Sequence, residues 1–398
     1  MNHTPGAARF ACALSTASSG SEAVSDALRQ LEQRLDGVEP DLVLAFATHH
    51  YGASLETLGP TVARATGARA LAGCTAESVL GDGREIEGSP GLVLWAATLP
   101  GTKIEPFHAV ARRTDGVVTF SSLPVEAERE RGSLLVLADP FTFPVDAFLD
   151  HVQEHYPALP MTGGIASGAM GPGQTLFFTA DGVEESGLQG LMLSGQESPR
   201  AVVSQGCRPV GKPFVITACE RNEIQKLAGR PALEVLFETV CQLEPSEQRL
   251  FQSGPFVGLA VDATRSTFER GDLLVRGVMG VNHAARSFSV SDFVRRGQTI
   301  HLQVRDPERA GEDLQALVQQ QGGGALASDS AAGALVFTCN GRGSRLFGCK
   351  DHDVRHVQAG LGRDIPTAGF FAAGEIGPVG GRNFLHGFTA SVAVFRGA

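Results

Sequence analysis

The sequence lacks the features that define several large classes of protein. No uninterrupted apolar run approaches the roughly 20 residues that a membrane-spanning helix needs, and the longest, around residues 90–100, is bounded by proline. Acidic residues outnumber basic ones by 43 to 33, which gives a formal charge of −10. The basic surface of a general nucleic-acid binder is therefore missing. We expect neither a membrane nor a nucleic acid as partner.

Cysteine pairs with the spacing of metal or redox motifs are also missing. The seven cysteines are scattered over the chain and none forms a CxxC pair, which argues against a zinc knuckle or a thioredoxin-like site. Free thiols in a chain of this length fit a reducing compartment. The first 20 residues hold one arginine and a brief apolar stretch, too little for a secretory signal. We therefore expect a cytoplasmic protein.

Glycine is abundant, with 49 residues, whereas there are one tryptophan and two tyrosines. The glycines fall in blocks within an order that occurs three times: strand, helix, strand, small-residue block, strand. The first strands of the three copies lie near residues 41–48, 134–139 and 334–339, and the blocks are 73–78, 163–168 and 369–375. We interpret this order as a degenerate internal repeat. The alternative, that any α/β chain alternates in this way, stays open.

A different segment separates the second and third copies. Residues 202–207, 214–220, 256–262, 273–282 and 300–305 have the composition of short strands, and 231–240 that of a helix. The sequence thus predicts an α+β fold: two mixed-sheet modules with helices packed outside, built as pseudo-symmetric repeats of a β-α-β-β unit. The predicted domains are residues 1–200 and 201–398.

Several glycine-rich motifs resemble those of the FIST family. They are Gly73-Cys-Thr75, Gly163-Gly-Ile-Ala-Ser-Gly168, Gly206-Cys-Arg-Pro-Val-Gly-Lys-Pro213, Gly229-Arg-Pro-Ala232, Cys339-Asn-Gly-Arg-Gly343 and Gly369-Phe-Phe-Ala-Ala-Gly-Glu-Ile376, followed by His386 and Thr389. The resemblance implies an N-terminal and a C-terminal FIST module in a sensor of signal transduction. It also implies a small-molecule ligand, with amino acids proposed, a protein partner for the output, and no established catalytic residue. Some bacterial members resemble haem-binding nitric-oxide sensors.

The small-residue blocks are the candidate binding site. A block that ends a strand lets a ligand approach backbone N–H groups, and ligands of α/β folds favour the carboxyl ends of strands. We predict one cleft at the junction of the modules, with these residues around it: Gly163, Gly164, Ser167, Cys339, Asn340, Arg342, Gly374, Glu375 and His386. The alternative, that the glycines only shape the strands, stays open.

Individual roles follow from side-chain chemistry. Arg342 suits a ligand carboxylate, and Glu375 suits a ligand ammonium or a structural partner. Cys339 is either a nucleophile or an inert core thiol, and His386 is either a ligand contact or a hydrogen-bonded core residue. In the segment 351–356 we favour a solvated helix start over a metal site.

Three functions remain after these considerations. The first is a non-enzymatic small-ligand sensor. The second is a gas sensor with non-covalent haem on one of the eleven histidines. The third is an enzyme that uses Cys339 or Glu375. We expect no catalytic residue and no metal ligand.

Overall fold

The computed structural model describes residues 7–123, 132–195, 198–262, 268, 272–322 and 331–397. The chain divides into two compact units, one made of residues up to Ser204 together with those from Gly311 onward, the other of Gln205–Ala310. Among the described residues, no helix combines the length and the apolar character needed to cross a bilayer.

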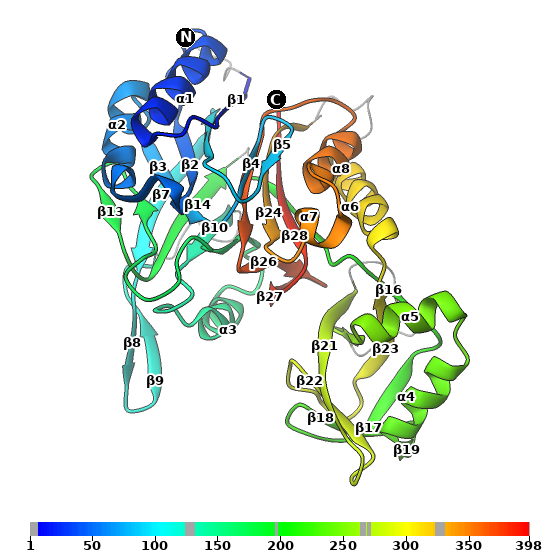
Figure 1. Ribbon diagram of the computed structural model, residues 1–398. Helices are drawn as coiled ribbons and strands as arrows, with labels where there is room; N and C mark the ends of the chain where they lie inside the picture. The colour runs from blue at the N-terminus through cyan, green and yellow to red at the C-terminus, as the bar shows by residue number, and fades with distance from the viewer. Residues whose placement is uncertain are drawn as a thin grey trace. The chain divides into compact units, whose positions relative to one another are not determined.

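The first unit contains three six-stranded sheets that share one strand order (Figure 1). The first sheet runs β1 (Arg9–Ser15), β6 (Leu92–Thr98), β2 (Leu42–Thr48), β3 (Ala70–Ala76), β12 (Phe177–Phe178) and β13 (Val183–Glu184). The second runs β7 (Thr102–Ala109), β14 (Leu188–Gly195), β10 (Gly132–Ala138), β11 (Met161–Ile165), β26 (Gly374–Val379) and β27 (Arg382–His386). The third runs β15 (Arg200–Ser204), β28 (Ala390–Arg396), β24 (Ala331–Cys339), β25 (Thr367–Ala372), β4 (Val79–Gly81) and β5 (Arg84–Ile86). In each sheet the third and fourth strands are parallel and their neighbours antiparallel.

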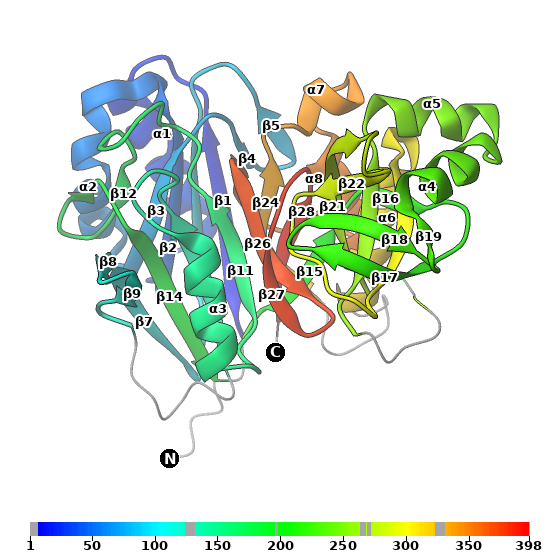
Figure 2. The ribbon, with the colours of Figure 1, turned by 90° about the horizontal axis from the view of Figure 1, so that it is seen from below.

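Each sheet receives its last two strands from a hairpin that follows a strand of another sheet in the chain. The β4–β5 hairpin follows β3 in the chain but pairs with β25 of the third sheet. The β12–β13 hairpin follows β11 but pairs with β3 of the first sheet. The β26–β27 hairpin follows β25 but pairs with β11 of the second, as Figure 2 shows. This cyclic exchange of hairpins ties the three sheets into one unit.

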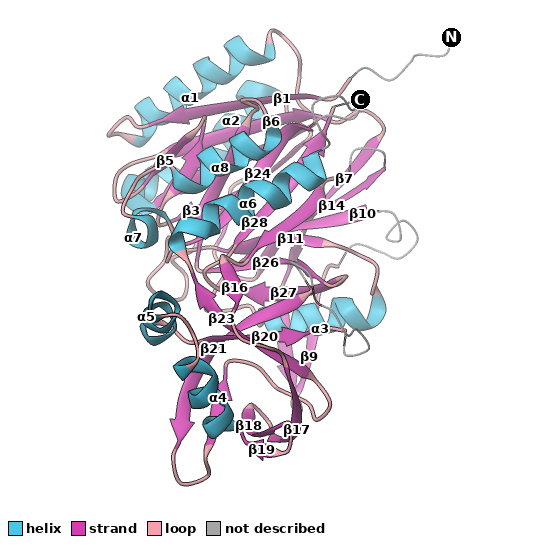
Figure 3. Cartoon of the chain, turned by 90° about the vertical axis from the view of Figure 1, so that its right-hand side faces the viewer, coloured by secondary structure: helices cyan, strands magenta, loops and turns pink. Residues whose placement is uncertain are grey.

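The inner faces of the three sheets share one apolar core, because the central strands are buried on both faces. The core includes Phe46 and Trp95 of the first sheet, Leu137 of the second, and Phe337 and Phe395 of the third. The outer faces have separate apolar clusters with the helices. These helices are α1 (Gly20–Leu35), η1 (His49–Thr57) and α2 (Leu58–Thr66) on the first sheet, α3 (Val145–His155) on the second, and α6 (Pro307–Gly322) and α8 (His352–Leu361) on the third (Figure 3). The short helix α7 (Gly343–Phe347) precedes α8, and β8 (Ala111–Thr114) pairs with β9 (Val117–Phe120) in a small separate hairpin.

The second unit is the predicted meander. Its strands are β16 (Cys207–Pro209), β23 (Thr299–Arg305), β17 (Phe214–Glu220), β18 (Glu223–Leu227), β22 (Ser287–Val290), β21 (Leu273–Asn282) and β20 (Phe256–Ala260), in this order, with β19 (Arg230–Pro231) beside β18. The helices of this unit are α4 (Ala232–Cys241) and α5 (Pro245–Ser253).

The predicted α+β class with mixed sheets and outer helices is confirmed. The compact units differ from the predicted division at residue 200, however, and pseudo-symmetry between two modules is not confirmed. The third repeat does not join the meander, because its strands pair with the β4–β5 hairpin of the first repeat and belong to the first unit. The meander forms the second unit.

One glycine in each small-residue block is required by the backbone. Gly73, Gly163 and Gly369 lie on the second parallel strand of their sheets with φ of +159°, +154° and +159°. A Cβ atom at any of them would lie 1.8–1.9 Å from the carbonyl oxygen of the paired residue on the neighbouring strand, which is Ala45, Val136 or Val336. No side chain fits there without moving the neighbouring backbone.

We expect Gly369→Ala to lower the free energy of unfolding by about 3 kcal/mol, because both the φ angle and the contact with the Val336 carbonyl oppose a Cβ atom. The matched control is Gly182→Ala, since Gly182 has the same φ of +159° but no atom within 4 Å of its Cβ position. Urea denaturation of both variants separates the clash from the backbone angle. Equal losses in the two variants would contradict the steric explanation.

Candidate functional site

The three small-residue blocks meet in the first unit. The Ser167 hydroxyl accepts a hydrogen bond from the Glu77 N–H at 2.9 Å and donates one to the Phe371 carbonyl, so one side chain joins all three blocks. A Cβ atom on Gly164 would lie 2.8 Å from the Cβ of Ala372. The predicted convergence of the blocks is therefore present as direct backbone packing.

The glycines of the predicted site lie close against neighbouring atoms of the protein. Gly163 is held against the Val136 carbonyl, and Gly164 pairs in register with Glu375. A Cβ atom on Gly374 would lie 3.0 Å from Leu385 and 3.1 Å from Ile165. Of the two interpretations left open by the sequence, the geometry of these glycines agrees with the structural one.

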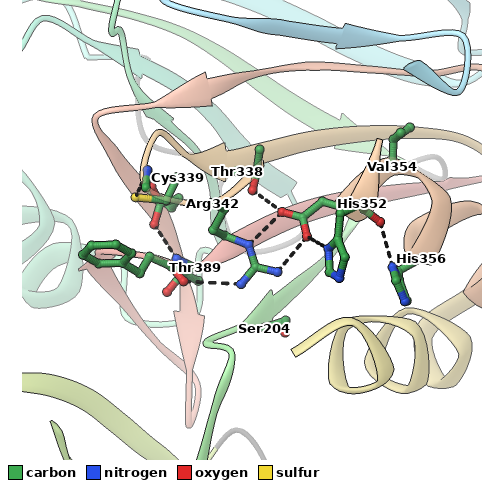
Figure 4. Close-up of polar contacts among 12 residues, drawn as sticks. Ser204, Thr338, Cys339, Arg342, His352, Val354, His356 and Thr389 are labelled. Carbon is green, nitrogen blue, oxygen red and sulfur yellow. Dashed lines mark hydrogen bonds and ion pairs between the residues drawn. The ribbon is translucent and has the colours of Figure 1, made fainter. Parts of the chain in front are cut away.

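Arg342 forms a buried ion pair with Asp353. Both side chains have no exposed area, and the Arg342 Nε and Nη2 atoms lie 2.7 and 2.8 Å from the two Asp353 carboxylate oxygens. Figure 4 shows the guanidinium between this carboxylate and the chain near Thr389, where its Nη1 donates to the Phe388 carbonyl at 3.4 Å. Burial alone would raise the pKa of Asp353, but the charge and the hydrogen bonds of Arg342 hold that pKa well below its usual range.

Two further side chains complete the Asp353 site. The Thr338 hydroxyl donates to one carboxylate oxygen, and the His352 Nδ1 lies 2.9 Å from the other. The ring of Phe347 stacks on His352 at 3.3 Å between centroids. Three residues of the β24–α8 segment, Thr338, Arg342 and His352, thus contact this carboxylate.

This arrangement changes two expectations. The carboxylate that Arg342 holds is that of Asp353, a residue of the protein itself. Helix α8 begins at His352, as predicted, but Asp353 is completely buried, so the expectation of a solvated helix start is wrong for this residue. Within the described ranges, no group of three or more His, Cys, Asp or Glu side chains is arranged to hold a metal ion.

Glu85 is an important residue that the sequence did not reveal. The exchanged β4–β5 hairpin brings it to the start of α8, where its Oε1 accepts the N–H groups of Asp353 at 2.9 Å and Val354 at 3.0 Å. Its other carboxyl oxygen is buried without a hydrogen-bond partner among the described residues. Burial and the nearby Asp353 charge raise the pKa of Glu85 to about 8. No local signal indicates this contact, because the two segments are 268 residues apart in the chain.

Glu375 is the second buried carboxyl group. It has no exposed area, and its Oε2 accepts the Thr389 N–H at 2.9 Å. Apart from the Cys339 thiol, a weak donor that adjoins the carboxyl group, its Oε1 has no hydrogen-bond partner in the described part of the chain. The Asn340 Oδ1 also has none among the described residues. Burial raises the pKa of Glu375 to about 8.

Cys339 and His386 adjoin Glu375. Burial and the Glu375 charge raise the pKa of the Cys339 thiol to about 11, so it stays protonated at neutral pH and lacks the thiolate of a nucleophile. His386 pairs with Glu375 across the β26–β27 hairpin, and its Nε2 lies 3.0 Å from the Gly377 carbonyl oxygen. These two residues therefore surround Glu375 with protein groups, as expected for a core thiol and a hydrogen-bonded core histidine.

The position of Glu375 is occupied by apolar residues in the other two sheets. In each sheet the residue that follows the strand glycine pairs with one hairpin residue: Gly164 with Glu375, Phe370 with Val79, and Cys74 with Phe177. Val79 and Phe177 are fully buried. Because the other two sheets have an apolar side chain at this position, pairing of the hairpin does not require the carboxyl group of Glu375.

Comparison with known proteins shows which family the chain resembles. The FIST N domain matches residues 41–230 and the FIST C domain matches residues 232–378. The chain belongs to the FIST family. FIST domains are associated with sensing in signal transduction. The uncharacterized protein Rv0628c of Mycobacterium tuberculosis is 36% identical to this FIST protein over 387 residues, which cover 97% of this chain and 99% of the relative. The uncharacterized protein Mb0898c of Mycobacterium bovis is also 36% identical, over 97% of this chain and 98% of the relative.

We expect Arg342→Met to lower the free energy of unfolding by about 3–5 kcal/mol, because it leaves the buried Asp353 charge without its partner. The double variant Arg342→Met/Asp353→Leu should recover most of this loss, since it removes both charges. The control is Arg230→Met, which breaks an ion pair with Glu238 whose side chains are 52% and 54% exposed. Because solvent screens this pair, the control should change stability far less than Arg342→Met. A double variant no more stable than Arg342→Met would contradict the charge explanation. Chemical denaturation measures all three.

The free energy of unfolding should fall as the pH rises from about 5 to about 8. The pKa values of Glu85 and Glu375 are raised from 4.5 to about 8 in the folded protein. The folded state therefore binds more protons than the unfolded state in this window, and each group contributes a slope of at most about 1.4 kcal/mol per pH unit. Glu85→Gln/Glu375→Gln should flatten the slope in urea titrations at several pH values, whereas Asp181→Asn, which changes an exposed carboxylate, should not. An unchanged slope in the double variant would contradict the assignment.

Proposed function

We propose that this FIST protein is a sensor for a small molecule that carries an ammonium group, with amino acids as the candidate class, and that a partner protein receives the signal. The observation that supports the proposal is the fully buried carboxyl group of Glu375, whose Oε1 has no hydrogen-bond partner among the described residues apart from the weak donor of the adjoining Cys339 thiol. A buried polar atom without a partner is costly unless a bound group satisfies it.

The raised pKa of Glu375 suits this role. Without a ligand the carboxyl group is largely protonated near neutral pH, because it is desolvated. An ammonium group within hydrogen-bond distance favours the ionised form, so binding releases a proton from Glu375. The Asn340 Oδ1 is a second buried acceptor without a hydrogen-bond partner among the described residues. An ammonium group has three N–H donors and can bind more than one acceptor. Because Asp353 occupies the guanidinium of Arg342, the proposal depends on the ammonium contact and assigns the ligand carboxylate no partner.

A change at Glu375 has a route to helix α8. The Thr389 N–H binds Glu375, and the neighbouring Phe388 carbonyl accepts from Arg342, which holds Asp353 at the start of the helix. Phe388 has a φ of +59°, which is unfavourable for a residue with a side chain. We propose that ligand binding at Glu375 moves this segment and thereby alters the surface that the partner protein recognises.

The other two functions receive less support from the residues in view. The buried His386 uses its Nε2 for the Gly377 carbonyl, so the imidazole that the site offers to haem iron is already engaged. A visible absorption spectrum of protein produced with haem remains the test of the haem hypothesis. An enzyme that depends on a Cys339 thiolate conflicts with the raised pKa of this thiol.

Isothermal titration with the twenty amino acids tests the sensor proposal. We expect at least one to bind, with an affinity that rises between pH 6 and pH 8 and a heat that depends on the ionisation enthalpy of the buffer, since a proton is released. Glu375→Gln should weaken binding at least tenfold, because the neutral amide loses the charge contact, which is worth about 1.4 kcal/mol or more.

The matched control is Glu184→Gln. Glu184 is an exposed carboxylate on the β12–β13 hairpin and should leave binding unchanged. Circular dichroism confirms that each variant is folded. Binding that Glu375→Gln leaves intact, or no binding of any amino acid, would overturn the proposal.

A further inference from the structure

A cavity of about 460 Å³ lies in the first unit and shares no lining residue with the site around Glu375. Its wall is built by β1, α1, the β4–β5 turn, α8 and the segment before β25, through residues that include Phe10, Cys12, Arg34, Asp82, Gln358 and Asp364. The volume is within the range of roughly 300–1,000 Å³ that small-molecule sites occupy.

One wall of the cavity is the edge of a sheet. Strand β1 is the outermost strand of the first sheet and pairs with β6 alone, without a register shift. The Cys12 carbonyl accepts from Arg34, and the Leu14 carbonyl accepts from Gln30 at 3.0 Å. In an antiparallel ladder the N–H and C=O of one residue point to the same side, and alternate residues point to opposite sides. The backbone groups of Phe10 and Cys12 therefore also point away from β6.

Two of these outward groups are available to a ligand. No hydrogen bond to the Phe10 carbonyl or from the Cys12 N–H is found among the described residues. The Phe10 carbonyl and the Cys12 N–H lie on either side of Ala11. In a parallel sheet, one residue of the neighbouring strand donates its N–H to such a carbonyl and accepts the N–H with its own C=O. An extended peptide is the ligand that supplies both groups at this spacing.

The charged side chains of the cavity favour a cation. Arg34 is already engaged, since its two terminal nitrogens lie 3.1 and 2.8 Å from the Asp82 carboxylate. Asp364 and Gln358 also line the cavity, and no ion pair or hydrogen bond joins the exposed Asp364 carboxylate or the Gln358 amide to a described residue. The lining thus retains one uncompensated negative charge, at Asp364.

We infer that this cavity binds a short peptide with a free amino terminus. One residue of the peptide extends beside Ala11, hydrogen-bonded to the Phe10 carbonyl and the Cys12 N–H, and the terminal ammonium binds Asp364. The side chains of Phe10, Ile365 and Pro366 give the peptide apolar contacts. A free amino acid lacks the internal amide N–H and is a poor ligand for this site. The inference is independent of the function proposed for Glu375.

Trialanine, N-acetyl-trialanine and free alanine are the probes. We expect trialanine to bind in isothermal titration and to shift the Cys12 amide resonance in ¹⁵N-resolved spectra of the full chain. N-acetyl-trialanine, which has no ammonium, should bind about tenfold more weakly, and free alanine should leave the Cys12 resonance in place. The Cys12 readout distinguishes this edge from any other peptide site.

Asp364→Asn should reduce the affinity for trialanine about tenfold, because it removes the charge that meets the ammonium. Asp181→Asn, which changes an exposed carboxylate elsewhere in the chain, should leave the affinity unchanged. No binding of trialanine, an unshifted Cys12 amide, or equal affinity for the wild type and Asp364→Asn would each overturn the inference.

Discussion

The exchange of hairpins is the constraint on which the first unit depends. Each of its sheets is completed by two strands from a different repeat, so no single β-α-β-β copy holds all the strands of its sheet. The two family domains are therefore not separate folding units. Their boundary, between residues 230 and 232, also falls inside the second unit, between β19 and α4.

The same exchange places charged groups in the interior. The β4–β5 hairpin brings Glu85 to the N-terminal end of α8, where the helix dipole and two free N–H groups favour an acceptor. Asp353 then lies between this carboxyl group and Arg342. Two buried carboxyl groups in one region cannot both be ionised without a cation near each of them. Arg342 satisfies Asp353 by direct contact, which leaves Glu85 and Glu375 with raised pKa values.

Local patterns in the sequence predicted local structure well. The strands predicted near 41–48, 134–139 and 334–339 are β2, β10 and β24, and the helix predicted at 231–240 is α4. These features depend on residues that are close in the chain. The pairing of hairpins between repeats was not predictable in this way, because β4 and β25 share only an apolar composition and small residues.

The candidate site could be predicted only in part, for the same reason. Small residues between strands indicated correctly where three chain segments meet, since close packing and glycine go together. The partner of Arg342 was not evident, because an aspartate at a helix start is usually solvated. A carboxyl group in the otherwise apolar strand at Glu375 indicated an unusual environment from the sequence alone. The structure shows that this side chain is fully buried.

The hairpin exchange also affects how the chain folds during synthesis. Strand β4 pairs with β25, whose residues follow it by almost three hundred positions, and β11 obtains its neighbour β26 from near the end of the chain. Contacts between residues so far apart in the chain slow folding, because closing a long loop costs conformational entropy before the contact stabilises the fold. A nascent chain that has emerged only through β14 still exposes the edge of β11 and the apolar residues of β4. Until β24–β28 have left the ribosome, the first unit is incomplete. Its exposed strand edges and apolar residues can then misfold or bind chaperones.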